Sequence, residues 1–335
     1  MNIASLPREP LAHLPTPLTH LPRLSSSLRG PSIWIKRDDQ TGLAGGGNKA
    51  RKLEFIAADA RGIGADVLLT AGGVQSNHAR MTAATAARLG MDAVLFLAGD
   101  EPEYRQGNLL LDELLGAELV FLDEEEDPEA SMEARVESLR REGKSPYAIP
   151  PGGSFPLGCA GYVLGGLELA GQAIRAGITV DHLVVSTGSG GTAAGLLLAL
   201  AHISPNTCLH AVSVGRSADE VRERILELAE GTAALLQWPC AGLGESLEVH
   251  DDFVGDGYAI PTPEGVRAGL ALARSEAILV DTTYTGKGLA GLVGLIERGR
   301  IGPGETAVFL HTGGVPAIFD ESHRGTFDRV WRREQ

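Results

Sequence analysis

The stretch LVVSTGSGGTAAGLLLALAHI, residues 183–203, decides the fold. Its apolar start at 183–186 predicts a buried strand, and residues 192–203 predict a helix. The turn between them is rich in glycine, which lets backbone N–H groups approach a bound anion closely. A strand, a tight turn and a helix together form the repeating unit of parallel sheets covered by helices.

The same alternation of short apolar runs and helical segments extends along most of the chain. Before residue 183 it predicts strands and helices in turn at 66–70, 77–89, 93–97, 108–115 and 119–122. After residue 203 it continues, again strand first, at 209–214, 219–236, 278–281, 288–298 and 307–311. The acidic run 123–127 is predicted as a solvated loop ahead of a helix at 132–141. The fold class that follows is α/β, with two doubly wound lobes and mainly parallel sheets.

The composition of the chain excludes several classes of partner and location. The chain has 335 residues, is 43% hydrophobic and carries a formal net charge of −14, which argues against nucleic acid and anionic membranes as partners. Cys159, Cys208 and Cys240 have neither disulfide nor metal-site spacing, so free thiols and no metal are expected. The first residues lack a signal-peptide pattern, and the apolar run 193–203 is too short to span a bilayer. A cytoplasmic protein acting on small molecules is therefore predicted.

The run Gly-Gly-Gly-Asn-Lys at 45–49 opens directly into a predicted helix. A lysine in a first helical turn opposes the helix dipole, which favours the neutral amine needed for a nucleophile or a Schiff base. From local sequence alone, a solvated helix start carrying Lys49, Arg51 and Lys52 is the more common explanation.

Two further turns between strands and helices favour anion binding. In Gly-Gly-Val-Gln-Ser-Asn-His at 72–78, the Ser76 hydroxyl and free N–H groups suit a carboxylate, although Ser76 or Asn77 could simply cap the helix. The glycine-rich turn at 188–192 is a phosphate cradle, and it also satisfies Gly-x-Gly-x-x-Ala. No acid follows the next strand to bind a ribose, which argues against NAD, while Arg216 leaves NADP open.

Three residues near the ends of later segments complete the candidate site. Tyr284 offers a phenol for proton transfer and Thr312 a hydroxyl for a ring nitrogen. An aromatic residue beside a turn is more often a packing residue, and this applies equally to Tyr258.

Taken together, these segments resemble the family of D-cysteine desulfhydrase and 1-aminocyclopropane-1-carboxylate deaminase, within the fold-type II pyridoxal-phosphate enzymes that include tryptophan synthase β. The motifs occur in order over almost the whole chain: Pro-Thr-Pro-Leu at 15–18, Ile-Lys-Arg-Asp-Asp at 35–39, Gly-Gly-Asn-Lys at 46–49, Arg-Lys-Leu-Glu at 51–54, Gln-Ser-Asn-His at 75–78, the glycine cradle, Tyr-Thr-Gly-Lys at 284–287 and His-Thr-Gly-Gly at 311–314.

The resemblance implies pyridoxal 5'-phosphate as the cofactor and Lys49, not Lys52, as its Schiff-base lysine. It implies a homodimer, a large cofactor-binding domain at 1–50 and 162–335, and a small domain at 51–161. The residue roles that it implies are catalysis by Lys49, Ser76, Tyr258 and Tyr284; cofactor binding by Lys49, Asn77, Gly188, Ser189, Gly190, Gly191, Thr192 and Thr312; and substrate binding by Ser76, Asn77, His78, Tyr258 and Tyr284.

Two hydroxyl side chains favour one branch of this family. The deaminase branch resembles this chain but has an acid where Thr285 stands and leucine where Thr312 stands. A carboxylate near the pyridine nitrogen strengthens the electron sink that ring opening needs, so two hydroxyls favour α,β-elimination. The predicted reaction is D-cysteine to pyruvate, sulfide and ammonia. L-Cysteate sulfo-lyase, the deaminase, an NADP-binding oxidoreductase and a non-catalytic binding protein are the alternatives.

Overall fold

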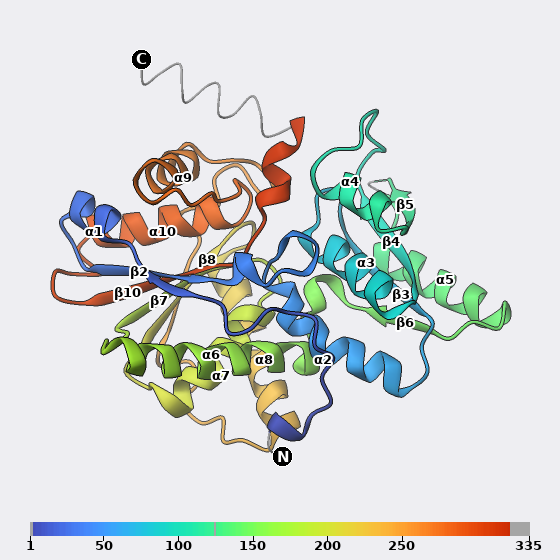
Figure 1. The fold of residues 1–335 in the computed structure, drawn as a ribbon, viewed down its shortest axis with the longest axis horizontal. Coiled ribbons are helices and arrows are strands. Elements are labelled where there is room, and N and C mark those ends of the chain that lie inside the picture. Colours follow the sequence, from blue (N-terminus) through green and yellow to red (C-terminus); the bar gives the residue numbers. More distant parts are fainter. Residues whose placement is uncertain (1–2, 124, 322–335) are drawn as a thin grey trace.

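A computed structural model describes residues 3–123 and 125–321 of the chain. It contains a six-stranded sheet in the order β1-β2-β10-β7-β8-β9 and a four-stranded sheet in the order β5-β4-β3-β6 (Figure 1). Every neighbouring pair of strands is parallel except β1 and β2. The predicted α/β class with two mainly parallel sheets is therefore confirmed.

The larger sheet has helices on both faces. Its strands are β1 (Leu18–His20), β2 (Ser32–Arg37), β7 (His182–Thr187), β8 (Cys208–Ser213), β9 (Leu247–His250) and β10 (Thr306–His311). One face carries α1 (Pro22–Leu28), α9 (Pro263–Glu276) and α10 (Thr285–Glu297) (Figure 1). The other carries α6 (Pro156–Ala176), α7 (Gly191–Ile203) and α8 (Ala218–Leu236). Because side chains alternate along a strand, Leu183 and Val185 pack toward α7 while Val184 packs toward α10.

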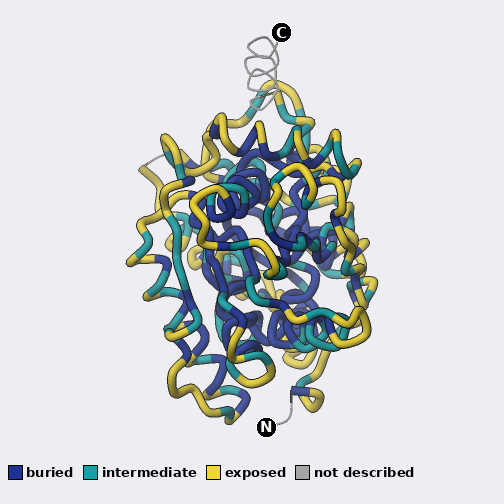
Figure 2. The backbone as a smooth tube through the Cα atoms, turned by 90° about the vertical axis from the view of Figure 1, so that its left-hand side faces the viewer, coloured by how far each residue is buried: buried dark blue, intermediate teal, exposed yellow. Residues whose placement is uncertain are grey.

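The smaller sheet is formed by β3 (Val67–Gly73), β4 (Asp92–Ala98), β5 (Glu118–Leu122) and β6 (Pro146–Ile149). Its helices are α2 (Lys49–Gly62), α3 (Asn77–Leu89), α4 (Gly107–Leu114) and α5 (Pro128–Arg141), with α5 on the face opposite α3. Figure 2 shows buried residues throughout the interior and exposed residues mainly in loops and outer helices.

Helix α2 joins the two parts of the molecule, because it packs against both α3 and α6. Gly161 of α6 allows this close approach, since a Cβ there would lie 2.2 Å from the backbone oxygen of Arg51. Arg51 is almost fully buried and makes ion pairs of 2.8 Å with Asp38 and with Glu168 of α6. The start of α2, which carries Lys49, is therefore held in place by buried charges as well as by packing.

Most of the elements predicted from sequence are present, but the strand at 278–281 is wrong. These residues form no strand, because their backbone groups are bound elsewhere. The Asp281 N–H donates to the Thr285 hydroxyl, and the oxygens of Leu279 and Asp281 meet His311 Nε2 and the Gly286 N–H. The helices predicted from 288 and 132 begin earlier, at Thr285 and Pro128.

All three cysteines are free thiols, as predicted. No described helix combines the length and apolar character needed to cross a membrane. The division into domains at residues 50/51 and 161/162 stays a prediction.

Candidate active site

A cavity of about 310 Å³ lies where the carboxyl ends of β3, β7 and β8 meet the first turns of α2, α3 and α7. This is the position expected for a ligand site in open α/β sheets. It is lined by Asn48, Lys49, Ala71, Gly72, Gly73, Ser76, Asn77, His78, Pro151, Gly152, Ser186, Thr187, Gly188, Ser189, Gly190, Thr192, Ala193, Val214, Gly215, Arg216, Tyr258, Tyr284 and Thr312. Of the residues predicted for the site, only Gly191 is absent from this lining.

The start of α2 forms the first wall of the cavity. Lys49 is the first residue of this helix and lines the cavity. Burial lowers the pKa of its amine well below 10.5, and the positive charges of Lys52 and Arg80 lower it further. Among the described residues, its nitrogen donates one hydrogen bond, of 3.2 Å, to the side-chain oxygen of Asn48. A neutral, weakly held amine is suited to attack an aldehyde or to remove a proton.

Lys52, one turn later, has a different environment. Its amine donates to the backbone oxygen of Gly152 at 3.0 Å and to the Ser154 hydroxyl at 2.9 Å, and it does not line the cavity. Burial lowers its pKa to about 8. A Cβ on Gly191 would lie 2.6 Å from this amine, so Gly191 provides the space that Lys52 occupies beneath the glycine-rich turn.

The start of α3 forms a second wall. Ser76 caps the helix by accepting a 3.1 Å hydrogen bond from the Ala79 N–H, so the capping role considered from sequence is real. The Asn77 side-chain oxygen accepts from Asn108 at 3.0 Å, and Asn108 is oriented by its own bond to the Gln75 oxygen. This arrangement leaves the Asn77 amide nitrogen as a donor for a ligand oxygen. Burial lowers the pKa of His78 well below 6.5, which keeps its imidazole neutral.

The glycine-rich turn between β7 and α7 forms the third wall. Gly190 has φ +83°, in the left-handed region that favours glycine, and it caps the 13-residue helix α7. The unpaired N–H groups of the first helical turn are therefore free of side-chain cover and suit a phosphate. The Thr192 hydroxyl is oriented by a 3.0 Å hydrogen bond from the Asn48 amide.

Tyr258 and Tyr284 come together across the mouth of the cavity. Their hydroxyls are hydrogen-bonded to each other, and their rings meet edge to face with centroids 5.8 Å apart. Burial raises the pKa of Tyr284 well above 10, so the phenol is protonated at neutral pH. Tyr258 is 49% exposed, so it contacts both solvent and the cavity.

Thr312 lines the cavity, whereas Thr285 does not. The Thr285 hydroxyl accepts from the Asp281 N–H at 2.9 Å, and it lies 3.5 Å from the Gly313 oxygen. Thr285 therefore supports the loop that carries Thr312. Among the described residues that line the cavity, none is acidic.

Sequence reasoning assigned no role in the cavity to Asn48 and considered Arg216 only for the NADP alternative. It assigned no role to Ser154, which supports the cavity. Asn48 orients both Lys49 and Thr192. Ser154 contacts Lys52 and, at 2.7 Å, the Ser189 hydroxyl. The Arg216 position after a strand was visible in the sequence, but Ser154 reaches the site only because α6 begins beside α7.

The cavity suits a cofactor that has an aldehyde, a phosphate and a pyridine ring. A neutral amine faces it from α2, a glycine cradle with free N–H groups faces it from α7, and a hydroxyl at Thr312 can bind a ring nitrogen. Its volume lies within the usual range for small-ligand pockets. The residues present therefore fit pyridoxal phosphate.

Comparisons with known proteins agree with this fit. Two D-cysteine desulfhydrases, from Salmonella paratyphi C (strain RKS4594) and Salmonella choleraesuis (strain SC-B67), are 41% and 42% identical over 325 residues, which cover 95% of this chain and 97% of each relative. The crystal structure of an ACC deaminase homologue has a TM-score of 0.90 and 37% identity, covering 98% of this chain and 97% of that one.

More distant structures share the fold. Threonine deaminase isoform 2 from Solanum lycopersicum, in its processed form, has a TM-score of 0.68 at 19% identity, with 98% of this chain and 86% of that chain covered. The family described as "Pyridoxal-phosphate dependent enzyme" matches residues 10–313. The chain therefore belongs to the pyridoxal-phosphate dependent enzymes, with the fold-type II architecture.

Proposed function

We propose that this protein is a carbon–sulfur lyase that converts D-cysteine and water to pyruvate, sulfide and ammonia. The observation that carries the proposal is that the Lys49 amine, whose pKa burial holds well below its ordinary value, lines the same cavity as the glycine-rich phosphate cradle. The two D-cysteine desulfhydrases that match nearly the whole chain support this substrate. Membership of the family sets aside the NADP-binding oxidoreductase and the non-catalytic binding protein.

Within the described part of the chain, no acidic side chain lines the cavity, and this favours elimination over ring opening. Thr312 offers only a hydroxyl to a ring nitrogen, so the nitrogen is not driven to protonate by a carboxylate. A weaker electron sink suffices when the β-substituent is a good leaving group such as a thiolate. Thr285 lies outside the cavity lining, so this choice rests on Thr312.

When bound, pyridoxal phosphate supplies an aldehyde that reacts with amines and a ring that spreads the negative charge formed at the substrate carbon. The protein residues have separate tasks. The Asn77 amide and the N–H groups near Ser76 bind and orient the substrate carboxylate. Lys49 holds a neutral amine that removes the α-proton. Tyr284, which keeps its proton at neutral pH, donates to the departing sulfur, with Tyr258 as its hydrogen-bond partner.

The test is an assay of the holoenzyme against D-cysteine, L-cysteine, L-cysteate and 1-aminocyclopropane-1-carboxylate, with the keto acid, sulfide and sulfite all measured. Pyruvate with sulfide from D-cysteine is expected. Formation of 2-oxobutanoate from the cyclopropane substrate with no sulfide from cysteine would replace the proposal by a deaminase. Ser76→Ala is expected to raise KM more than it lowers kcat.

One observation favours L-cysteate as a second candidate substrate. Arg216 lines the cavity next to Gly215, and a Cβ on Gly215 would lie 2.8 Å from Tyr258, so the residue at 216 lies on the side of the tyrosines and carries a cationic side chain. A sulfonate needs such a cation. Arg216→Gln should leave D-cysteine turnover within about twofold, whereas a lyase for cysteate would lose sulfite release.

We also propose that the enzyme is a cytoplasmic homodimer. The proposal rests on the resemblance of its motifs to the family named above. Analytical ultracentrifugation of the holoenzyme would test the dimer, and a monomer at micromolar concentration would contradict it.

A further inference from the structure

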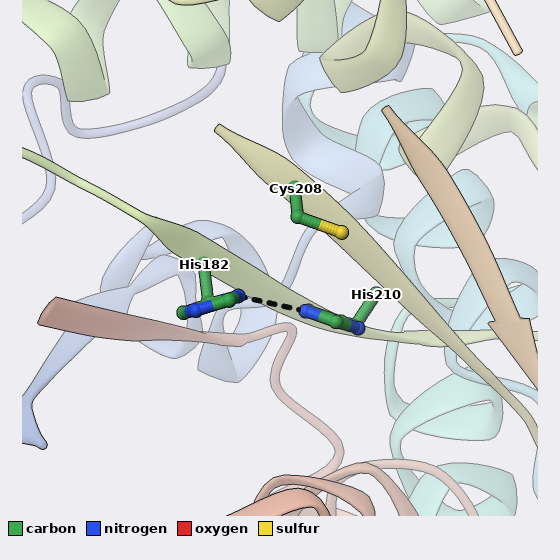
Figure 3. A group of neighbouring side chains, drawn as sticks. All are labelled: His182, Cys208 and His210. Atoms are coloured by element: carbon green, nitrogen blue, oxygen red, sulfur yellow. Dashed lines mark hydrogen bonds between the residues drawn. The ribbon is translucent and has the colours of Figure 1, made fainter. Parts of the chain in front are cut away.

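Three histidines lie in a row on neighbouring strands of the larger sheet. His182 begins β7, His210 is on β8 and His250 ends β9. The strand register pairs His182 with Cys208 and His210 with Glu248, so by alternation all five side chains project from one face. Figure 3 shows the His182 and His210 rings facing each other, with the Cys208 side chain beside them. None of the five lines the active-site cavity.

The ligand atoms at the β9 end of this row are spaced for a metal ion. His210 Nδ1 lies 3.0 Å from His250 Nε2, and Glu248 Oε2 lies 3.7 Å from the first nitrogen and 3.9 Å from the second. Zinc bonds of about 2.0–2.2 Å in tetrahedral geometry place ligand atoms roughly 3.3–3.5 Å apart. The three atoms therefore need to move by only a few tenths of an ångström to share one ion.

The surrounding groups orient these ligands. His210 Nε2 lies 3.0 Å from His182 Nδ1, and His182 Nε2 lies 3.3 Å from the Glu305 carboxylate. A carboxylate only accepts, so it favours a proton on His182 Nε2 and leaves His182 Nδ1 to accept from His210. Arg300 donates to Glu248 Oε1 at 2.8 Å, which leaves Oε2 facing the two imidazoles. Metal-binding histidines and carboxylates commonly have such partners.

The proton shared by His210 and His250 does not prevent a cation from binding. The short contact between His210 and His250 holds one proton. An ion at this position displaces that proton to the other nitrogen of the His250 ring, and no net charge has to leave the protein.

We propose that His210, Glu248 and His250 form a binding site for a divalent transition-metal ion, zinc in the first instance, with solvent as the fourth ligand. Two imidazoles and one carboxylate suit zinc better than magnesium, which prefers six oxygens. The ion would link the short edge strand β9 to β8. The site differs from the sequence-based expectation of no metal, because Glu248 and His250 lie 38 and 40 positions after His210 in the chain.

The test is zinc binding to the substrate-free holoenzyme after chelator treatment, measured by competition with a chromophoric chelator. Wild type is expected to bind about one zinc ion per chain with excess magnesium present. His250→Ala and Glu248→Gln should each weaken binding at least about tenfold. Both positions are partly exposed, so neither change empties the core. The exposed His20→Ala is the matched control and should bind like wild type.

The ligand set is checked separately. A second group of side chains, His182, Cys208 and His210, also comes within metal-binding distance. Only this second group contains a cysteine, so Cys208→Ser and the spectrum of the cobalt-substituted protein distinguish it from the proposed group. Unchanged binding in Cys208→Ser and no thiolate-to-cobalt charge-transfer band are expected. Loss of binding in Cys208→Ser, equal binding in all variants, or no stoichiometric zinc would overturn the proposal. None of these measurements depends on activity, so a failed lyase assay leaves the result readable.

Discussion

At the residue scale, Lys49 and Lys52 are three positions apart on one helix but differ in what they contact. Lys49 lines the cavity, and Asn48 is its one hydrogen-bond partner among residues 3–123 and 125–321, whereas two oxygens hold the Lys52 amine. We expect Lys49→Ala to abolish turnover, together with the yellow colour that a Schiff base with pyridoxal phosphate gives the purified protein. Lys52→Ala should keep measurable turnover with weaker cofactor binding. Visible absorbance and pyruvate release check both, and a yellow, active Lys49→Ala would reassign the lysine.

The pH dependence of cofactor capture follows from the same residue. Because the Lys49 pKa is lowered in the folded protein, the reactive neutral amine is already abundant well below pH 10.5. The capture rate of pyridoxal phosphate by apoenzyme should therefore level off far below that pH. Lys52→Met removes a neighbouring positive charge and should move the plateau to higher pH. Stopped-flow absorbance measures this, and a rate that rises up to pH 10.5 in wild type contradicts it.

At the element scale, the turn between β7 and α7 depends on Gly190. An alanine there enters the left-handed region, which costs about 1 kcal/mol of stability, and its Cβ would lie 3.3 Å from Arg224 and Leu228. Gly177→Ala is a matched control with φ +68° at the end of α6 and open space around it. Both variants should lose similar stability. Only Gly190→Ala should weaken cofactor retention, measured by dialysis; equal retention would show that the turn holds no phosphate.

The buried ion pairs that hold α2 predict acid sensitivity. Burial alone would raise the pKa of Asp38, but Arg51 outweighs it and holds the pKa below 3.8. The carboxylate therefore contributes stability above pH 3.8, which is lost as pH falls through the lower, folded-state pKa. Asp38→Asn should cost about 3 kcal/mol at pH 7 and flatten this acid limb. Urea unfolding at several pH values measures it, with the exposed Asp92→Asn as control.

At the scale of the whole molecule, the cavity joins walls from both sheets, so a bound cofactor ties the two parts together. A ligand at about 1,000 times its Kd stabilises the folded state by about 4 kcal/mol. Removing pyridoxal phosphate should lower the thermal midpoint by several degrees, and adding it back should restore the midpoint. Calorimetry checks this. Lys49→Ala, which retains the cradle, should recover only part of the shift.

Hydrophobic periodicity and turn composition were enough to predict most strands and helices, because local patterns control them. The segment at 278–281 has the same apolar pattern as a strand, yet Thr285 and His311 bind its backbone groups instead. Helix α6 contains four glycines that disfavour a helix locally: Gly158, Gly161, Gly165 and Gly166. They are needed because neighbouring residues, including some of α2 and α7, pack where a side chain would otherwise lie.

By itself the sequence determined the fold class, the family resemblance and the candidate residues of the three walls, since each wall is one strand-to-helix turn with its own local motif. The family resemblance already pointed to Lys49, but only the tertiary structure showed that Lys49 lines the cavity and Lys52 does not. It alone showed that Tyr258 meets Tyr284 and that His210, Glu248 and His250 gather on one face. Those facts depend on strand order and on helix rotation. Both are set by contacts between residues far apart in the chain, which no single stretch of sequence encodes.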